Sequence, residues 1–276
     1  MTRCELFESI SSTTWDLIAR NNYRHNRLNE EGITRQTVIS AIHNYVEDNR
    51  RFDVFAQKAR NEVNTGADLE LFIQNPLGSF SRILLQAKIM ETNNTFENLN
   101  RNSGSTGRKQ YDTLINCAYR LGAKSYYLLF NGIYNYWTTG KDCAGSFNEK
   151  QFGCAVLEAN QIKNHCEMNN TGRLGDINNP QPKGNPWRFL SCCNQDDWRL
   201  LNSYSFEDID KDSHFDKIFN ESGLTSFLRQ DDFQRRSNVE LNNNYVHNSG
   251  WNPCARIFIT TNGNKMMKEN NLLTTI

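Results

Sequence analysis

Two neighbouring stretches of the chain alternate between hydrophobic and polar positions, with the period of two that is typical of β-strands. Residues 67–74 read ADLELFIQ and residues 81–90 read SRILLQAKIM. Between them lies a turn sequence that contains Asn75, Pro76 and Gly78. We therefore expect two antiparallel strands joined by a tight connection.

The polar residues within these two strands fall on matching faces. In the first strand Asp68 and Glu70 lie opposite the face of Leu69, Leu71 and Ile73; in the second strand Gln86 and Lys88 share one face. If the strands pair through the turn, both polar sets lie side by side near one end of the sheet. The pattern thus predicts a single cluster of four polar side chains.

Helical spacing precedes this strand pair. Val38, Ile42 and Val46 predict a helix over 35–48 with Thr34 as its N-cap. A second helix is predicted over 52–63, ended by Asn64-Thr65-Gly66 and lined by an apolar stripe of Phe52, Phe55, Ala59 and Val63. Glu62 falls in its last turn, where the helix dipole disfavours an acid. It is either a solvated side chain or an acid held at the edge of a site.

The elements that follow predict an α/β fold. A polar loop is expected over 92–107, a helix over 108–121 and a strand over 125–131. The order helix, strand, strand, helix, strand favours a mixed sheet flanked by helices. Further along, the pattern predicts a helix over 149–164, a proline-rich loop over 176–187, a helix over 212–228 and a strand over 255–261.

The domain organisation is read from the same pattern. We expect residues 1–147 to form the core, and residues 148–276 to form a C-terminal elaboration packed on the same domain. A boundary between two domains near 140–148 is the alternative.

Composition changes this picture little. The 276 residues carry 31 Lys plus Arg and 31 Asp plus Glu, so a net charge of zero neither indicates nor excludes a nucleic-acid partner. No secretory signal and no apolar run of membrane length is evident, so we expect a cytoplasmic protein without a membrane partner. The eight cysteines lack CxxC spacing and are expected as free thiols. A zinc site is the weaker alternative, from Cys143, Cys154, His165 and Cys166.

The predicted polar cluster requires a chemical explanation, because an unpaired buried carboxylate is costly. An Asp–Lys pair alone would explain it structurally. Acidic and amide oxygens beside a lysine also suit Mg²⁺ or Mn²⁺, which would activate a water toward a phosphodiester. Lys88 would then stabilise charge on the phosphoryl oxygens, or orient and deprotonate the water.

Asp68 followed by the QAK triplet at 86–88, which closes a hydrophobic strand, resembles the PD-(D/E)xK nuclease superfamily in its QxK variant, typical of Mrr-like restriction endonucleases. The resemblance covers about 35–131. More narrowly, the chain looks like a bacterial family of restriction-endonuclease-like proteins associated with anti-phage defence. The segments that carry this likeness are TGADLEL at 65–71, QAK at 86–88, QYDTLI at 110–115 and PWRFLSCC at 186–193.

The resemblance implies a restriction-endonuclease-like α-β-β-α-β core and a role for each matching residue. Asp68 would be the principal metal ligand, joined by the Gln86 side-chain oxygen and the Ala87 carbonyl, with Lys88 as the catalytic lysine. Glu62 would contact the metal directly or through water. Gln110 would point toward the site, while Glu70 would either support the metal or lie too far along the strand. Gln86 stands where many members have Glu, so metal binding should be weaker.

The function implied is a Mg²⁺- or Mn²⁺-dependent endonuclease that hydrolyses DNA, with RNA as a less favoured substrate, in bacterial antiviral defence. The alternative is a catalytically degenerate module of the same fold that binds nucleic acid or a protein. A homodimer and an activating defence partner are further expectations, with the C-terminal half as the place for such contacts. Basic residues are either phosphate contacts or a solvated face, namely Arg82, Lys109, Arg120, Lys124, Arg229, Arg235 and Arg236.

Overall fold

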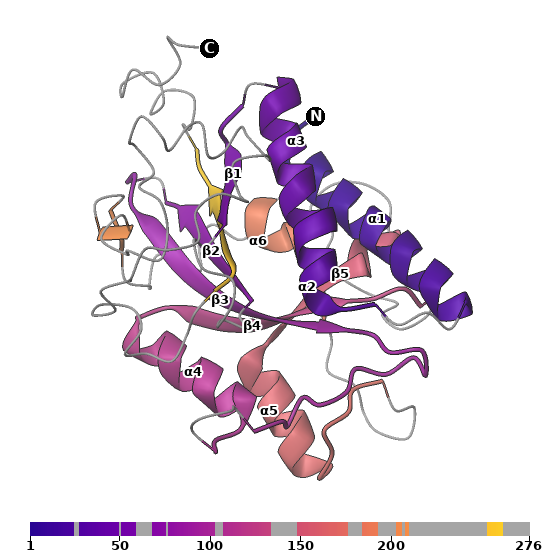
Figure 1. The fold of residues 1–276 in the computed structure, drawn as a ribbon. Coiled ribbons are helices and arrows are strands. Elements are labelled where there is room, and N and C mark those ends of the chain that lie inside the picture. Colours follow the sequence, from indigo (N-terminus) through magenta and orange to yellow (C-terminus); the bar gives the residue numbers. More distant parts are fainter. Residues whose placement is uncertain are drawn as a thin grey trace, which may run out of the picture.

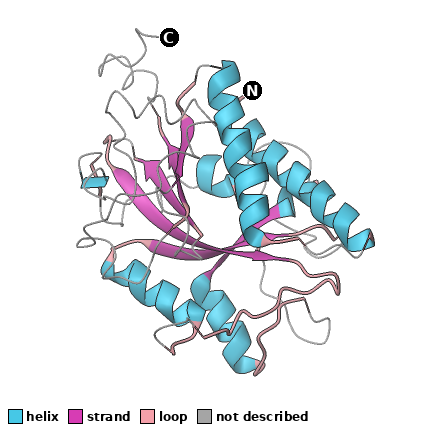
Figure 2. Cartoon of the chain, in the orientation of Figure 1, coloured by secondary structure: helices cyan, strands magenta, loops and turns pink. Residues whose placement is uncertain are grey.

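The computed structural model describes residues 1–24, 28–49, 51–58, 68–75, 77–102, 107–133, 148–175, 184–192, 203–205, 208–209 and 253–261. Within these residues the chain forms an open, mixed seven-stranded sheet in the order β1-β7-β2-β3-β4-β5-β6 (Figures 1 and 2). Its strands are β1 (Val54–Lys58), β2 (Leu69–Gln74), β3 (Phe80–Ile89), β4 (Lys124–Phe130), β5 (Cys154–Glu158), β6 (Asn185–Pro186) and β7 (Ala255–Ile259). The α/β class predicted from the sequence is therefore confirmed.

The predicted strand pair is present as the hairpin β2–β3. The two strands are antiparallel, with Leu69 opposite Leu85 and Gln74 opposite Phe80. Gly78 adopts a φ of 91°, which a residue with a side chain rarely takes, and its N–H donates to the Asn75 carbonyl at 3.0 Å. The alternation of hydrophobic and polar residues and the turn chemistry thus agree on one register.

The predicted strand over 255–261 is confirmed as β7, and it occupies an unexpected place. β7 lies between β1 and β2, antiparallel to β1 and parallel to β2. Because β5 and β6 extend the other side of the sheet, strands from residues 1–147 and from residues 148–276 share one sheet. The C-terminal half thus supplies part of the sheet's middle as well as one edge.

Helices cover the sheet in two groups (Figure 1). One group is α1 (Arg3–Tyr23), α2 (Glu30–Ile33), a π-helical segment η1 (Thr34–Ile39) and α3 (Ser40–Asn49). The other comprises α4 (Gln110–Arg120) and α5 (Ala159–Met168), which lie on the opposite side of β4. Two short helices complete the described elements, the 3-10 helix η2 (Glu149–Gly153) and α6 (Arg188–Cys192). No helix among the described residues is long and apolar enough to cross a membrane.

The first helical group was predicted only in part. The helix expected over 35–48 exists, but it begins at Glu30, and Asn29 caps it by accepting the Gly32 N–H. The predicted N-cap Thr34 is wrong, because this residue lies within the helix. The long helix α1 was not predicted; a capping box between Thr2 and Glu5 caps its N-terminus.

Two other helix predictions fall on strands. The described part of the helix expected over 52–63 is the strand β1, and residues 59–67 lie outside the described part. The helix expected over 149–164 divides into η2, β5 and the start of α5. Strands buried on both faces present continuous apolar runs, which periodicity alone does not separate from helices.

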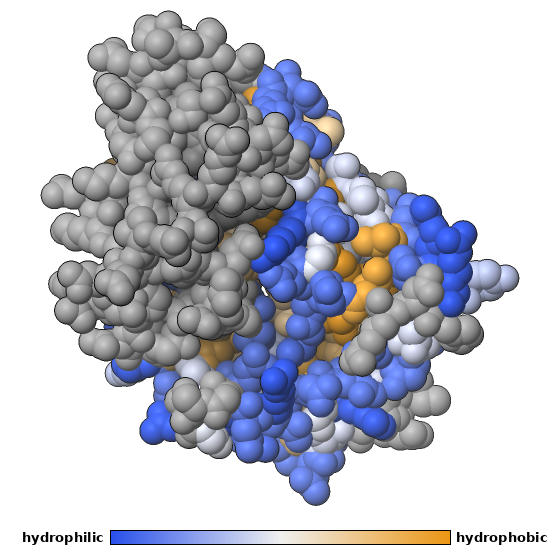
Figure 3. Space-filling view, viewed as in Figure 1, coloured by the Kyte–Doolittle hydropathy of each residue, from blue (hydrophilic) through white to orange (hydrophobic). Residues whose placement is uncertain are grey.

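The remaining predictions agree with the described elements. The helix over 108–121 is α4, with Leu114, Cys117 and Ala118 buried, and the strand over 125–131 is β4. The loop predicted over 176–187 ends in β6, while residues 176–183 and the helix expected over 212–228 lie outside the described residues. In the space-filling view, the described residues form a mainly hydrophilic surface around a smaller apolar area (Figure 3).

The helix α1 packs closely on the segment before β5. A Cβ atom added at Gly153 would lie 1.9 Å from the Ser11 carbonyl oxygen, so only glycine fits there without a shift of backbone. The indole N–H of Trp187 donates to the Phe7 carbonyl at 3.0 Å and ties α1 to the residues after β6. This contact holds the N-terminal helix against the C-terminal half.

We expect Gly153→Ala to lower the free energy of unfolding by about 1–3 kcal/mol, because α1 must move to accept the methyl group. Urea denaturation followed by circular dichroism measures this change. Lys150→Ala is the matched control: it removes a partly exposed ion pair between the same segment and Asp16 and should cost less than about 1 kcal/mol. Equal stability of Gly153→Ala and wild type would contradict the close packing.

Candidate functional site

Asp68 lies directly before β2 and carries a buried carboxylate. The Ala87 N–H donates a hydrogen bond to this carboxylate, whereas its Oδ2 atom has no hydrogen-bond partner among the described residues. Burial raises the pKa of Asp68 well above its ordinary value; the Lys88 ammonium opposes this shift and Glu30 adds to it. The main chain at Asp68 is held by the Cys254 N–H, which donates to the Asp68 carbonyl at 2.9 Å.

Lys88 is buried near the end of β3 and faces an acid that sequence reasoning missed. Its Nζ lies 3.8 Å from Glu30 Oε1, and Glu30 is the first residue of α2. Acids in a first helical turn are ordinarily explained by the helix dipole, so no sequence pattern distinguishes Glu30 from other such acids. The structure thus brings Asp68, Lys88 and Glu30 together from a loop, a strand and a helix.

Gln86 lies on the same face as Asp68 and Lys88, as the alternation of the strands predicted. Because Leu69 pairs with Leu85, the register places Asp68 opposite Gln86, and on the other side β4 places Tyr127 beside Gln86. The Ala87 N–H points toward Asp68, and the N–H and C=O of one strand residue point to the same side. The Ala87 carbonyl is therefore directed toward the Asp68 side of β3.

Glu70 is occupied by a buried ion network. Arg82 Nε donates to its Oε1 at 3.1 Å, and Arg256 Nε donates to its Oε2 at 3.0 Å. Burial raises the pKa of Glu70, but the two guanidinium groups more than offset this, so the pKa lies below its ordinary value. These contacts favour a structural role for Glu70 over support of a metal, and they make the buried Arg82 unsuited to contact phosphate.

The other candidate residues are Gln110, Glu62 and the alternative zinc set. Gln110 begins α4, which follows the end of β3, and its Oε1 is buried without a hydrogen-bond partner among the described residues. Glu62 lies outside the described residues. Of the alternative zinc set, His165 Nε2 lies 2.9 Å from the Arg173 carbonyl, Cys154 Sγ contacts Thr14, and Cys143 is not described.

The donor set can be tested against a divalent cation. Within the part of the chain that the structure describes, no three His, Cys, Asp or Glu side chains are grouped closely enough to hold a metal ion. The predicted set relies instead on oxygens of mixed type, from one carboxylate, one amide and one main-chain carbonyl, and hard cations such as Mg²⁺ accept all three. A buried Asp68 oxygen without a partner fits such a cation, with Glu30 as a second acid nearby.

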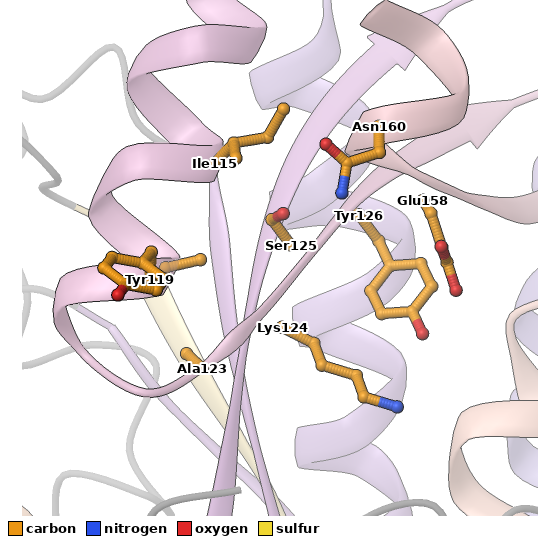
Figure 4. Close-up of a pocket in the computed structure, with 9 residues that line it drawn as sticks. Ile115, Tyr119, Ala123, Lys124, Ser125, Tyr126, Glu158 and Asn160 are labelled. Atoms are coloured by element: carbon orange, nitrogen blue, oxygen red, sulfur yellow. The ribbon is translucent and has the colours of Figure 1, made fainter. Parts of the chain in front are cut away.

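A separate hollow of about 280 Å³ lies where β4 begins, between the last turn of α4 and the first residues of α5 (Figure 4). Its lining includes Tyr119, Ser125, Glu158 and Asn160. In the close-up Ser125 points toward α4, whereas Lys124 and Tyr126 point the other way. This hollow is at the opposite end of β4 from Leu129, the register partner of Lys88, so it is distinct from the candidate site.

The fold and site define an α/β protein with a polar cluster where β2 begins and β3 ends. The chain belongs to a family of unknown function, DUF6615, whose model matches residues 3–267. No curated protein and no solved structure matches the chain.

We expect Glu70→Gln to destabilise the protein by about 3–5 kcal/mol at neutral pH, because it leaves buried arginine charge uncompensated. Since the folded-state pKa of Glu70 is lowered, its contribution is present above its unfolded pKa and is lost as pH falls through the folded value. Urea denaturation at several pH values measures the difference in free energy of unfolding between wild type and Glu70→Gln. This difference should be largest at about pH 6–8 and shrink below about pH 4.

A control for this measurement is Glu167→Gln, at an exposed residue 3.8 Å from Lys163, which should change stability by less than about 1 kcal/mol. A cost for Glu70→Gln no larger than that of Glu167→Gln would contradict the buried ion network.

Asp68→Asn should raise the thermal stability of the metal-free protein at neutral pH. The substitution removes a buried carboxylate whose Oδ2 has no partner among the described residues, at nearly unchanged volume. Differential scanning calorimetry in EDTA measures the unfolding midpoint, with Asp16→Asn, at a partly exposed acid, as the matched control. A lower midpoint for Asp68→Asn would contradict the absence of a stabilising partner for Asp68 Oδ2 among the described residues.

Proposed function

We propose that this protein is a metal-dependent nuclease with a restriction-endonuclease-like core, which hydrolyses phosphodiester bonds of DNA. The observation that carries the proposal is the buried Asp68 carboxylate, which has an unpartnered oxygen and lies near both Lys88 and Glu30. A carboxylate desolvated in this way is stabilised by a cation. A single ammonium shared with Glu30 at 3.8 Å does not saturate the two acids.

The residues suited to hold Mg²⁺ or Mn²⁺ are Asp68, the Gln86 amide oxygen and the Ala87 carbonyl, with Glu30 in the role expected of Glu62. When bound, the divalent ion would supply Lewis-acid polarisation of the phosphodiester and a more acidic water. The protein contributes a fixed carboxylate, since the Ala87 N–H and the Cys254 N–H both hold Asp68 in place. It also contributes a site of low exposure, where electrostatic interactions are stronger than in water.

Lys88 is the residue best placed to act on the substrate. Its ammonium lies on the same face as Gln86, two residues further along β3, and Glu30 fixes its direction. There it would stabilise negative charge that grows on the phosphoryl oxygens, or orient the attacking water. Its burial among hydrophobic strands keeps this charge pre-organised instead of solvated.

Gln86 favours a second candidate, a module of the same fold that binds nucleic acid or protein without cleaving it. A neutral amide in place of an acid lowers the negative charge of the site and weakens its hold on a metal. Antiviral defence in a bacterial cytoplasm, a homodimer and an activating partner belong to the proposal through the resemblance to restriction endonucleases, which is an argument by analogy.

The nuclease proposal is tested by incubating plasmid DNA, linear DNA and an RNA panel with the purified protein in Mg²⁺ or Mn²⁺. We expect cleavage of DNA that EDTA abolishes, and a loss of at least about a hundredfold in Lys88→Ala and Asp68→Ala, because each removes a group that acts in the transition state. Glu30→Ala should lose activity as well, although by less if Glu62 also contributes.

Matched controls are Lys150→Ala and Asp16→Ala, which remove a partly exposed lysine and a partly exposed acid that pair with each other outside the candidate site, and both should cut at the wild-type rate. Equal cutting by all variants would point to a contaminating nuclease. Binding of DNA without any cleavage under both metals would overturn the catalytic proposal in favour of the binding module.

A further inference from the structure

The hollow at the start of β4 is a notch that the sheet itself leaves open. The ladder between β4 and β5 ends at Tyr126, so the first two residues of β4 extend past the last residue of β5. The end of α4 and the first residues of α5 border the notch on two sides (Figure 4). A volume of about 280 Å³ remains between these elements, at the end of β4 that is remote from Lys88.

Two polar side chains that line this hollow have no hydrogen-bond partner among the described residues. They are Ser125 on β4 and Asn160, the second residue of α5. In the close-up Ser125 points toward α4, and the Asn160 amide points toward β4 (Figure 4). An amide carries both a donor and an acceptor, and a hydroxyl can act as either. Together they suit a ligand edge on which donors and acceptors alternate.

The charged side chains of the same lining are directed elsewhere. The Glu158 carboxylate accepts the Gln161 N–H and so caps the start of α5, while the Lys124 side chain points away from Ser125 (Figure 4). A helix start that already carries a carboxylate does not favour an anion, because the acid offsets the positive end of the helix dipole. The part of a ligand that enters this hollow should therefore be uncharged.

The α4 side of the hollow is apolar and ends in an exposed aromatic ring. Ile115 and Ala118 line this side, and the neighbouring Tyr119 is 85% exposed. Nucleobases stack on such rings, since every base has a π-face. Pockets for drug-sized ligands measure about 300–1,000 Å³, so this slightly smaller hollow suits a single fused ring system. A base inside a duplex cannot enter it without leaving its stack.

We propose that this hollow binds one unpaired purine base, with adenine preferred. The base stacks on Tyr119, and its edge bonds to the Asn160 amide and the Ser125 hydroxyl. An asparagine amide matches adenine because its oxygen accepts from N6 and its NH₂ donates to N7. The ligand is either a free nucleoside or an unpaired nucleotide of a single strand. The site lies outside the proposed nuclease site and does not depend on it.

The test measures binding in EDTA, so that metal-dependent cleavage plays no part. Fluorescein-labelled oligo-dA and oligo-dT of about ten nucleotides are titrated by fluorescence anisotropy, and adenosine is titrated by isothermal calorimetry. We expect tighter binding of oligo-dA than of oligo-dT. Tyr119→Ala should weaken oligo-dA binding about tenfold because it removes the stacking surface, whereas Tyr119→Phe keeps the ring and should stay within about twofold of wild type.

Two further variants serve as control and as specificity probe. Tyr23→Ala removes an equally exposed ring, at 86%, from the end of α1 outside the hollow, and should bind oligo-dA as wild type does. Asn160→Asp keeps the size of the side chain and places an acid in the first turn of α5, where the helix dipole favours it. The variant loses the NH₂ that donates to N7, so the preference for oligo-dA over oligo-dT should disappear.

The two probes distinguish the sources of the base. Adenosine that binds wild type and binds Tyr119→Ala at least about fivefold more weakly would show that a free nucleoside suffices. Binding of oligo-dA alone, weakened by the same substitution, would show that the base must belong to a strand. Either result supports the base site.

Three results would overturn the proposal. They are no binding of either probe, oligo-dA binding that is equally strong in Tyr119→Ala and Tyr23→Ala, and an unchanged preference for oligo-dA in Asn160→Asp. Because none of these measurements involves cleavage, failure of the base site leaves the nuclease proposal standing, and failure of the nuclease proposal leaves the base site standing.

Discussion

A fully buried carboxylate held by two arginines joins three strands of this sheet. Glu70 on β2 bonds Arg82 on β3 and Arg256 on β7, and Phe72 lies under both guanidinium groups, at 5.6 and 5.7 Å from its ring centroid. Such a network is not a strong source of stability compared with a hydrophobic core. It is, however, specific, because a shift of β7 or β3 by one residue would leave buried charge unpaired. The network thereby fixes the strand alignment that brings Asp68 level with Gln86.

Two acids two residues apart therefore have opposite environments. Glu70 is neutralised on both oxygens, whereas Asp68 is buried with one oxygen unpartnered among the described residues. Their pKa values are displaced in opposite directions for that reason, downward for Glu70 and upward for Asp68. A buried carboxylate with a raised pKa, such as Asp68, is characteristic of functional sites. A buried carboxylate whose pKa is lowered by paired arginines, such as Glu70, is typical of structural ion pairs. The contrast between the two acids supports the choice of Asp68, and not Glu70, as the metal ligand in the proposed function.

Local sequence patterns predicted the β2–β3 hairpin, the residues that share each of its faces, and the helix α4. Alternation, turn residues and helical spacing all depend on residues that are close together in the sequence. They failed where a strand is buried on both faces. Phe52 and Phe55 have helical spacing by coincidence, and the partner strand of β1 is β7, whose residues Ala255–Ile259 lie far along the chain. The same limit explains Glu30: its approach to Lys88 depends on how the helix that begins there packs against β3, which no local pattern records. Glu70 could be placed on the correct face, but its arginine partner Arg256 lies far along the chain.

The insertion of β7 between β1 and β2 also bears on protein synthesis. Ribosomes release the chain from its N-terminus, so the middle of this sheet stays open until residues 255–259 have emerged. A product that terminates before this point would have Glu70 without Arg256 and Asp68 without the amide of Cys254. Truncated translation products would therefore lack both the ion network around Glu70 and the main-chain contact that holds Asp68 in place.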